Sequence, residues 1–213
     1  MKYQSIRQQV LDALREASEL GLIHGTSGNI AVRDPAGSVI AISPSGRPYK
    51  TMTAEEIAIV APDGTWIDGP YKPSSETPMH TAVYRARPDV GATVHLHGLF
   101  STVMAMDGGE LPPSTPPQAE LAPIRVVPFE LPGSEALARR VVDALGPSGT
   151  AVLLKNHGSF CCGRDLACAM SAAIYSEEAA QTAYYATLLG RFHPLSPREI
   201  EDVKAALEAG RAV

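Results

Sequence analysis

Two histidines separated by one residue are the clearest candidates for chemistry in this sequence. They lie in Val94-His95-Leu96-His97-Gly98, a short run of β-forming residues. Because successive side chains of a strand point to opposite faces, His95 and His97 are expected on one face and Leu96 in the packing on the other. Two imidazoles on one face can bind one metal ion, but a hydrogen-bonded pair at a strand end has the same pattern. Gly98 is expected to let the backbone turn away after the strand.

A third histidine has a similar setting much later in the chain. His157 follows the apolar run Val152-Leu153-Leu154 and precedes Gly158, so it too is expected at the end of a buried strand. Three histidines brought together by two strands would form a facial ligand set for Zn²⁺ or another first-row ion, with positions left open for substrate. The remaining histidines are expected to be structural or solvated: His24, His80 and His193.

Small polar residues form a second group of candidates. Ser74 and Ser75 precede Glu76 at an expected helix start, where hydroxyls and free N–H groups suit an anion. The same residues could simply cap the helix, with Glu76 favoured by the helix dipole. The turns 25–29 and 43–46 offer further hydroxyl and N–H groups. Such turns hold phosphate well, and they are also common in ordinary hairpins.

The elements that must position these residues are short strands followed or flanked by helices. Helices are expected over residues 3–20, 77–87, 134–145 and 165–189 and from Ser196, where Ser, Pro and Glu suit N-cap, N1 and N3. Strands are expected over 30–32, 39–42, 57–61, 65–67, 92–96 and 150–154, the first four as two hairpins. Residues 100–106 are expected to form a helical turn, and the proline-rich stretch 111–128 an irregular ordered loop. This order predicts an α/β sandwich on a mostly antiparallel or mixed sheet.

The bulk composition excludes several classes of protein. The 213 residues are 45% hydrophobic and 19% charged, which suits a single domain over 1–213 with a sizeable core. The net charge of −5, without a basic run, argues against nucleic-acid binding. The N-terminal residues 1–18 mix charged with apolar residues and lack the uninterrupted apolar stretch of a signal peptide or a membrane helix. Cys161, Cys162 and Cys168 make a poor disulfide framework, so they predict a reducing, cytoplasmic setting, with small thiols packed around a helix start.

Five motifs, taken in order, resemble those of the class II aldolase/adducin family. They are Gly25-Thr26-Ser27-Gly28-Asn29, Ser43-Pro44-Ser45-Gly46, Pro73-Ser74-Ser75-Glu76, His95-Leu96-His97 and Asn156-His157-Gly158. The resemblance runs from about residue 5 to residue 190. It implies a three-layer α/β/α sandwich on a mostly antiparallel or mixed central sheet. It also implies a homotetramer with fourfold symmetry and active sites at subunit interfaces.

The resemblance also implies roles for individual residues. His95, His97 and His157 match zinc ligands, with Mn²⁺, Co²⁺ or Fe²⁺ as alternatives to Zn²⁺. Glu76 matches the carboxylate that binds the metal without substrate and acts as acid/base with it. The matching phosphate pocket comprises Thr26, Gly28, Asn29, Ser45, Gly46, Ser74 and Ser75. The implied enzyme is an aldolase for a small phosphorylated ketose, similar to fuculose 1-phosphate, acting through a metal-stabilised enediolate.

The chain departs from the family pattern on the aldehyde side. The fuculose-phosphate aldolases use tyrosines in the loop after the H-x-H strand and near the C-terminus. This sequence has no tyrosine between Tyr84 and Tyr175 and none after Tyr185. Glu120 lies where the epimerases of the family carry an acidic residue, and Arg47 could pair with a phosphate or a carboxylate. Both side chains are equally compatible with a solvated surface position.

Several other functions therefore stay open. An epimerase of a ketopentose phosphate, a decarboxylase of a phosphorylated β-keto acid and, more distantly, a metal-assisted dehydratase could use the same scaffold. A decarboxylase would need no tyrosine for an aldehyde, and Arg47 could hold its substrate's carboxylate. A non-catalytic binding protein is the alternative from another class. The intact histidines and Glu76 favour an enzyme.

Overall fold

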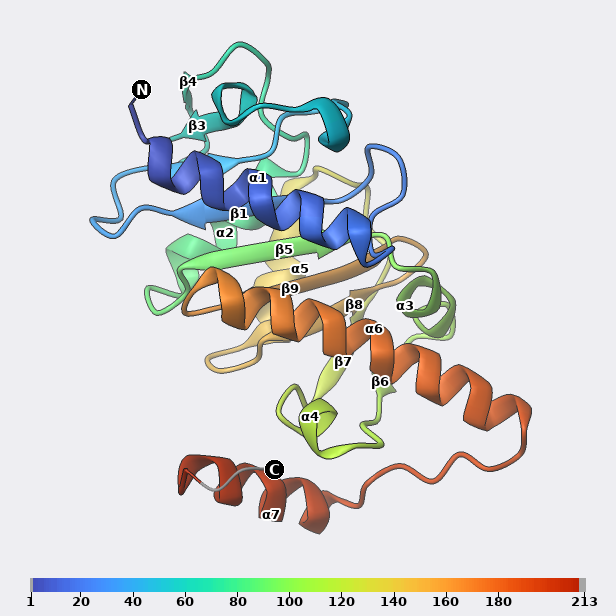
Figure 1. The fold of residues 1–213 in the computed structure, drawn as a ribbon. Helices are drawn as coiled ribbons and strands as arrows, with labels where there is room; N and C mark the ends of the chain where they lie inside the picture. Colours follow the sequence, from blue (N-terminus) through green and yellow to red (C-terminus); the bar gives the residue numbers. More distant parts are fainter. Residues whose placement is uncertain (1, 211–213) are drawn as a thin grey trace.

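A nine-stranded sheet forms the centre of the computed structural model, which describes residues 2–210 (Figure 1). The strands are β1 Asn29–Arg33, β2 Ile40–Ile42, β3 Ala58–Val60, β4 Trp66–Asp68, β5 Ala92–Leu96, β6 Glu110–Leu111, β7 Ile124–Val127, β8 Ala151–Leu154 and β9 Gly158–Gly163. Their order across the sheet is β4-β3-β2-β1-β5-β9-β8-β7-β6. Neighbouring strands are antiparallel except for β7 and β8, which are parallel.

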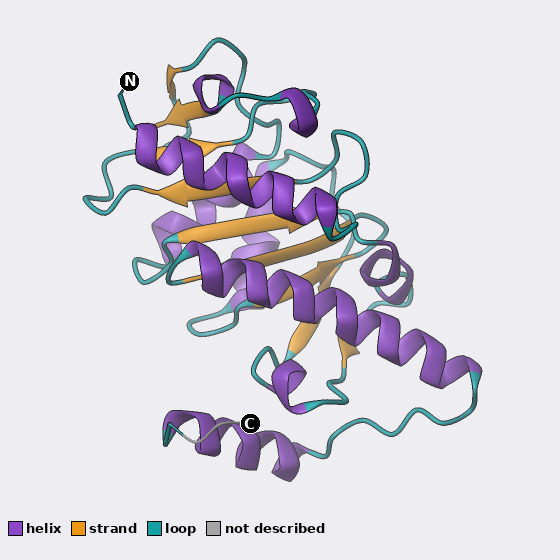
Figure 2. Cartoon of the chain, in the orientation of Figure 1, coloured by secondary structure: helices purple, strands orange, loops and turns teal. Residues whose placement is uncertain are grey.

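Helices cover both faces of this sheet (Figure 2). On one face lie α1 (Gln4–Glu19) and α6 (Leu166–Leu188), and on the other lie α2 (Thr77–Ala86) and α5 (Glu135–Leu145). The shorter or peripheral helices are α3 (Leu99–Met104), α4 (Pro116–Ala119) and α7 (Pro197–Glu208), with 3₁₀ turns at Tyr49–Thr51 and Ala54–Glu56. The predicted three-layer α/β/α sandwich on a mixed sheet is confirmed.

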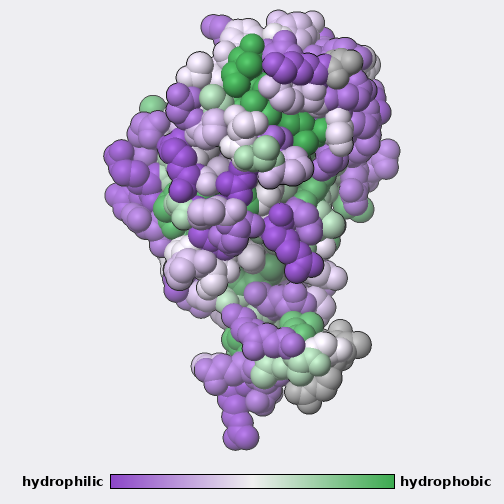
Figure 3. Space-filling view, turned by 90° about the vertical axis from the view of Figure 1, so that its left-hand side faces the viewer, coloured by the Kyte–Doolittle hydropathy of each residue, from purple (hydrophilic) through white to green (hydrophobic). Residues whose placement is uncertain are grey.

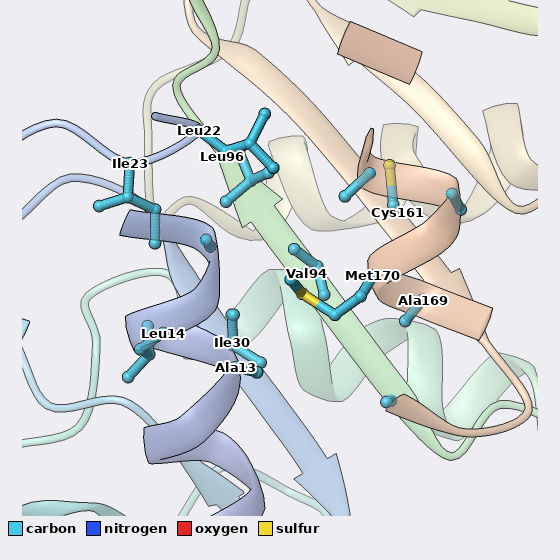
Figure 4. Close-up of a cluster of buried hydrophobic side chains, with 14 of the residues drawn as sticks. Ala13, Leu14, Leu22, Ile23, Ile30, Val94, Leu96, Cys161, Ala169 and Met170 are labelled. Carbon is cyan, nitrogen blue, oxygen red and sulfur yellow. The ribbon is translucent and has the colours of Figure 1, made fainter. Parts of the chain in front are cut away.

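The alternation of β5 divides its side chains between the two layers. Val94 and Leu96 are fully buried on the face that α1 and α6 cover, with Val94 beside Met170 of α6 and Leu96 beside Leu22, which follows α1 (Figure 4). Each such apolar side chain contributes about 1.5–3 kcal/mol through burial. Thr93 and His95 point to the opposite face, toward α2. The strand therefore sits rigidly in the core while its polar side chains face one helix.

Local sequence signals account for the helix starts. Ser134 accepts a hydrogen bond from the N–H of Leu137 at the start of α5. Ser196 and Glu199 form the expected capping box at the start of α7. The two predicted hairpins are also present, as the pairs β1–β2 and β3–β4.

Two expectations about the second half of the chain are wrong. Residues 111–128 are not a loop throughout, because they include α4 and β7, and β7 pairs with β8. The prolines at 123 and 128 flank β7 without interrupting it. Their presence made the segment resemble a loop, although Ile124–Val127 between them has the β-branched residues of a strand. Cys168 does lie at a helix start, in the first turn of α6, but the buried thiols of Cys161 and Cys162 lie within strand β9, between β5 and β8. Glycine, serine and cysteine give this strand little β-propensity, so packing against its two neighbours determines it.

The surface is mixed in character. On the face shown in Figure 3, hydrophilic residues dominate and hydrophobic residues form separate small areas. None of the helices within residues 2–210 combines the length and the apolar composition that a membrane crossing needs.

Candidate metal centre

Four side chains converge near the carboxyl-terminal end of β5. Glu76 is the N-cap of α2, His95 lies in β5, His97 follows that strand directly, and His157 lies in the tight turn between β8 and β9. Potential ligand atoms, one from each residue, all lie within 4.8 Å of one another. The pairing of β5 with β9 brings the two histidine-bearing segments together.

A hydrogen bond determines which nitrogen of His95 faces the centre. Its Nδ1 lies 2.8 Å from the carbonyl oxygen of Ser159, which can only accept, so Nδ1 carries the proton. In the neutral ring, Nε2 then presents a free electron pair, 2.8 Å from Oε2 of Glu76 and 2.9 Å from Nε2 of His97. A backbone carbonyl on the outer nitrogen is the usual arrangement for a metal-ligating histidine.

The ionisation of the cluster suits a divalent cation. Burial lowers the pKa of His97 and of His157 to about 4, so both rings are neutral at pH 7. Burial raises the pKa of Glu76, but the surrounding imidazole and amide groups lower it by more, so the carboxyl is ionised. Oε1 of Glu76 is buried and accepts no hydrogen bond within residues 2–210. Three imidazoles and one carboxylate fit Zn²⁺ or a similar first-row ion.

A glycine allows the two histidine-bearing segments to approach. A Cβ on Gly158 would collide with the carbonyl oxygen of Leu96, the residue between His95 and His97. The close contact between β5 and the start of β9 therefore requires glycine at this position. Because His157 directly precedes Gly158, the same contact fixes its distance from the other two histidines.

The second glycine, Gly98, has a different role from the one expected. Its φ of −58° is open to any residue, so the expectation that it frees the backbone to turn is wrong. A Cβ there would instead collide with the carboxylate of Glu177 on α6. That carboxylate accepts hydrogen bonds from the N–H groups of Phe100 and Ser101, at 2.8 and 2.9 Å. Glu177 thus caps α3 directly after His97.

A pocket of about 260 Å³ adjoins the cluster. It is lined by Glu76, His97 and His157, and by all seven residues of the implied phosphate pocket: Thr26, Gly28, Asn29, Ser45, Gly46, Ser74 and Ser75. Within the described part of the chain, the N–H groups of Gly28, Gly46 and Ser75 donate no hydrogen bond. Ser74 also stabilises the local turn, because its hydroxyl accepts from the N–H of Glu76. The lining can therefore donate several hydrogen bonds to an anion next to the four ligands.

The two less certain candidates lie elsewhere. Arg47 pairs with Glu56 at 2.7 Å and stacks over the ring of Tyr71 at 4.2 Å, and it does not line this pocket. Glu120 is exposed at the rim of a separate cavity beside α6. The structure does not bring either residue to the cluster.

Of the two settings expected for His80, structural or solvated, the structure shows the structural one: its side chain is fully buried and lies 2.5 Å from Asn29, which bonds to Glu76. Its link to the cluster was not expected from the sequence. The available signal was its spacing of four residues from Glu76, which places both side chains on one face of a helix.

Comparisons with known proteins agree with this geometry. Residues 8–184 match the model of the class II aldolase and adducin N-terminal domain. The chain is 33% identical over 209 residues to 5-deoxy-D-ribulose 1-phosphate aldolase of Bacillus thuringiensis serovar kurstaki, covering 98% of both chains. It is 31% identical over 201 residues to L-ribulose-5-phosphate 4-epimerase of Salmonella paratyphi B, covering 86% of both.

A solved structure shows the same fold over nearly the full length. An L-fuculose 1-phosphate aldolase superposes with a TM-score of 0.91 at 28% identity, with 98% of each chain covered. Sequence motifs, fold and site geometry therefore agree, and the chain belongs to the class II aldolase and adducin family.

Proposed function

We propose that this chain is a metal-dependent aldolase that cleaves or forms a C–C bond in a small ketose 1-phosphate. The observation that carries the proposal is that one pocket joins the Glu76–histidine cluster to a lining rich in hydroxyl and N–H donors. A ketose 1-phosphate needs both features, since its phosphate lies close to the carbonyl and hydroxyl oxygens where charge develops. Its family membership makes the chain a metal-dependent lyase of the class II aldolase type.

His95, His97, His157 and Glu76 would hold one divalent ion per subunit, with Zn²⁺ favoured by the ligand types. Bound there, the ion supplies the positive charge that stabilises negative charge developing on the substrate oxygens. The serines and glycines of the pocket hold the phosphate. Binding of the phosphate next to the N-terminus of α2 is favoured by the helix dipole.

Glu76 moves the proton in this proposal. In cleavage, the hydroxyl on the carbon that becomes the aldehyde loses its proton, the C–C bond breaks, and Glu76 delivers a proton to the carbon that keeps the electron pair. In synthesis Glu76 removes that proton. The only ionisable groups among the described lining residues are Glu76, His97 and His157. We therefore assign the hydroxyl proton to a water molecule rather than to a tyrosine.

The substrate class follows from the polarity of the pocket and from the relatives. Pro44 and Pro132 are the apolar members of the lining, and Leu131, next to Pro132, is 70% exposed. A sugar whose far end lacks a hydroxyl suits such a rim, and the Bacillus relative is named for 5-deoxy-D-ribulose 1-phosphate. Fuculose phosphate also ends in a methyl group, so the name of that relative is what leads us to propose a 5-deoxyketose 1-phosphate ahead of it.

The quaternary structure is also part of the proposal. Leu99, Phe129 and Leu131 are 57–70% exposed, and all three lie in segments adjoining the pocket or the cluster. Large apolar side chains at a pocket rim suit an interface between subunits. A homotetramer with active sites at its interfaces predicts a mass of four chains in analytical ultracentrifugation.

The test is a product assay on metal-loaded protein. Ketose 1-phosphates, including 5-deoxy-D-ribulose 1-phosphate, should yield dihydroxyacetone phosphate and an aldehyde, and His95→Ala should abolish both. Phosphorylated β-keto acids and L-ribulose 5-phosphate test the decarboxylase and the epimerase in parallel. Carbon dioxide without aldehyde, or a change of configuration without cleavage, would overturn the aldolase assignment.

The epimerase is the second candidate, because one relative carries that name. The position of Glu120 weakens it. This side chain is exposed beside a different cavity, so within one subunit it cannot act on a substrate held by Glu76.

A further inference from the structure

A line of buried polar side chains runs behind the metal cluster. Glu76, His80 and Tyr84 are spaced four residues apart, so they share one face of α2. This face lies over β1 and β5, where Asn29 pairs in register with His95. The line therefore begins at the cluster and passes into the core between the helix and the sheet.

The contacts along the line are short and continuous. Nδ2 of Asn29 lies 3.1 Å from Oε2 of Glu76, and Oδ1 of Asn29 lies 2.5 Å from Nε2 of His80. The other ring nitrogen of His80 lies 2.6 Å from Oγ1 of Thr93. His80 is fully buried, so no solvent reaches either nitrogen.

The carboxylate fixes the orientation of the Asn29 amide and the tautomer of His80. A carboxylate can only accept, so the NH₂ group of Asn29 must face Glu76 and its oxygen must face His80. Nε2 of His80 therefore carries a hydrogen, and Nδ1 is left to accept the single hydroxyl hydrogen of Thr93, whose oxygen also lies 3.1 Å from the Tyr84 hydroxyl. Burial lowers the pKa of His80 to about 3, so the ring has one N–H only. This tautomer is the opposite of that of His95, whose Nδ1 carries the hydrogen.

We propose that His80 is a positioning residue for Glu76: its Nε2–H holds the Asn29 amide in the one orientation that presents an N–H to the carboxylate. The inference rests on the proposed function for the role of Glu76 in proton transfer. Without the ring, nothing else in the described chain bonds to Oδ1 of Asn29. The amide can then flip and place an acceptor against the carboxylate, which displaces Glu76 from its working position.

The expected size of the effect follows from other metal sites. Loss of a group that orients a metal ligand through a hydrogen bond costs 10- to 100-fold in metal affinity or activity. We expect His80→Leu to weaken metal affinity about 10-fold. We expect kcat to fall by about the same factor or more, with KM changed less than about threefold, because the phosphate pocket stays intact.

The first experiment reads the tautomer directly. In metal-loaded protein labelled with ¹⁵N-histidine, the His80 signals, identified by their loss in His80→Gln, should show the Nε2–H form. A metal-ligating histidine such as His95 should show the Nδ1–H form. An Nδ1–H form of His80 would overturn the proposal, because Nε2 could then not hold the amide oxygen.

The second experiment is a double-mutant cycle on metal affinity, measured by competition with a chelator. If His80 acts through Asn29, His80→Leu should weaken binding in the wild-type background and add little to Asn29→Ala. Independent, additive effects would overturn the proposal. His80→Gln, which keeps one donor and one acceptor, should recover most of the affinity.

Tyr84→Phe is the matched control, since it removes a buried hydrogen bond from the same helix face. The Tyr84 hydroxyl donates to the carbonyl oxygen of Ala31 at 2.7 Å and lies 3.1 Å from Oγ1 of Thr93. Its loss therefore leaves Thr93 free to donate to His80 and does not touch the His80–Asn29 contact. It should lower stability while leaving kcat and metal affinity within about twofold. Equal losses in Tyr84→Phe and His80→Leu would show a merely structural role. If the wild type turns over no substrate, the proposed function fails, while the tautomer and the affinity cycle still decide the role of His80.

Discussion

Lowering the pH should destabilise this fold in a way that His80 makes measurable. The ring is fully buried and uncharged, with a pKa lowered to about 3 by burial, against 6.5 for an exposed histidine. Below pH 6.5 the unfolded chain binds a proton at this residue and the folded chain does not. Acid therefore favours unfolding, and the stability contributed by the neutral ring is lost progressively from about pH 6.5 down to about pH 3.

The magnitude follows from the two pKa values. Each pH unit between them costs about 1.4 kcal/mol, so lowering the pH from 7.5 to 5.0 should remove about 2 kcal/mol through His80 alone. His97 and His157, with pKa values of about 4, add losses in the same range. Comparing the pH dependence of the free energy of unfolding between the wild type and His80→Gln gives the contribution of His80 alone, because glutamine does not titrate.

The assay is urea unfolding of both proteins after treatment with a chelator and at one protein concentration. The chelator removes the contribution of bound metal, and the equal concentration makes the contribution of subunit association the same for the two proteins. Between pH 7.5 and 5.0, the wild type should lose about 2 kcal/mol more than His80→Gln. Parallel pH dependence in the two proteins would refute the reasoning, because His80 would then titrate alike in the folded and unfolded states.

Four further substitutions test other parts of the site. Gly158→Ala should cost more than about 2 kcal/mol in thermal or urea unfolding and lower the bound metal per chain, since its Cβ collides with the backbone of Leu96; full metal content would contradict this. Glu177→Ala should cost about 1–2 kcal/mol by uncapping α3, and an unchanged unfolding midpoint would count against it. Ser75→Asp should raise KM for a phosphorylated ketose about 10-fold or more at unchanged metal content; an unchanged KM would remove Ser75 from the phosphate pocket. Arg47→Ala should leave KM within about twofold, because the guanidinium is engaged outside the pocket; a large rise in KM would restore it as a substrate-binding candidate.

The elements around the cluster could be predicted because their local signals agree with the fold. Alternation in residues 92–96 placed His95 and Leu96 on opposite faces, and both positions are confirmed. The capping residues of α5 and α7 marked the helix starts correctly. The repeated pattern of a histidine followed by glycine at a strand end indicated that His157 joins the same centre, but the antiparallel pairing of β5 with β9 that brings it there is a long-range contact with no local signal.

The missed features depend on tertiary contacts. Strand β9 has few strong strand formers, and its position between β5 and β8 determines its conformation. The reason for glycine at position 98 is a carboxylate contributed from residue 177, far along the chain. His80 looked ordinary because its two partners, Asn29 and Thr93, lie on different strands. Spacing could place it on the face of Glu76, but only the packed structure shows the hydrogen bonds.

The most direct test of the central claim is exchange of a hydrogen of dihydroxyacetone phosphate in D₂O, followed by NMR on metal-loaded protein. If Glu76 removes a proton next to the carbonyl, the wild type should replace one of the two hydrogens on the hydroxymethyl carbon. Glu76→Gln, checked to retain metal, should replace neither. Exchange that persists in this variant, or is absent from the metal-loaded wild type, would contradict the account.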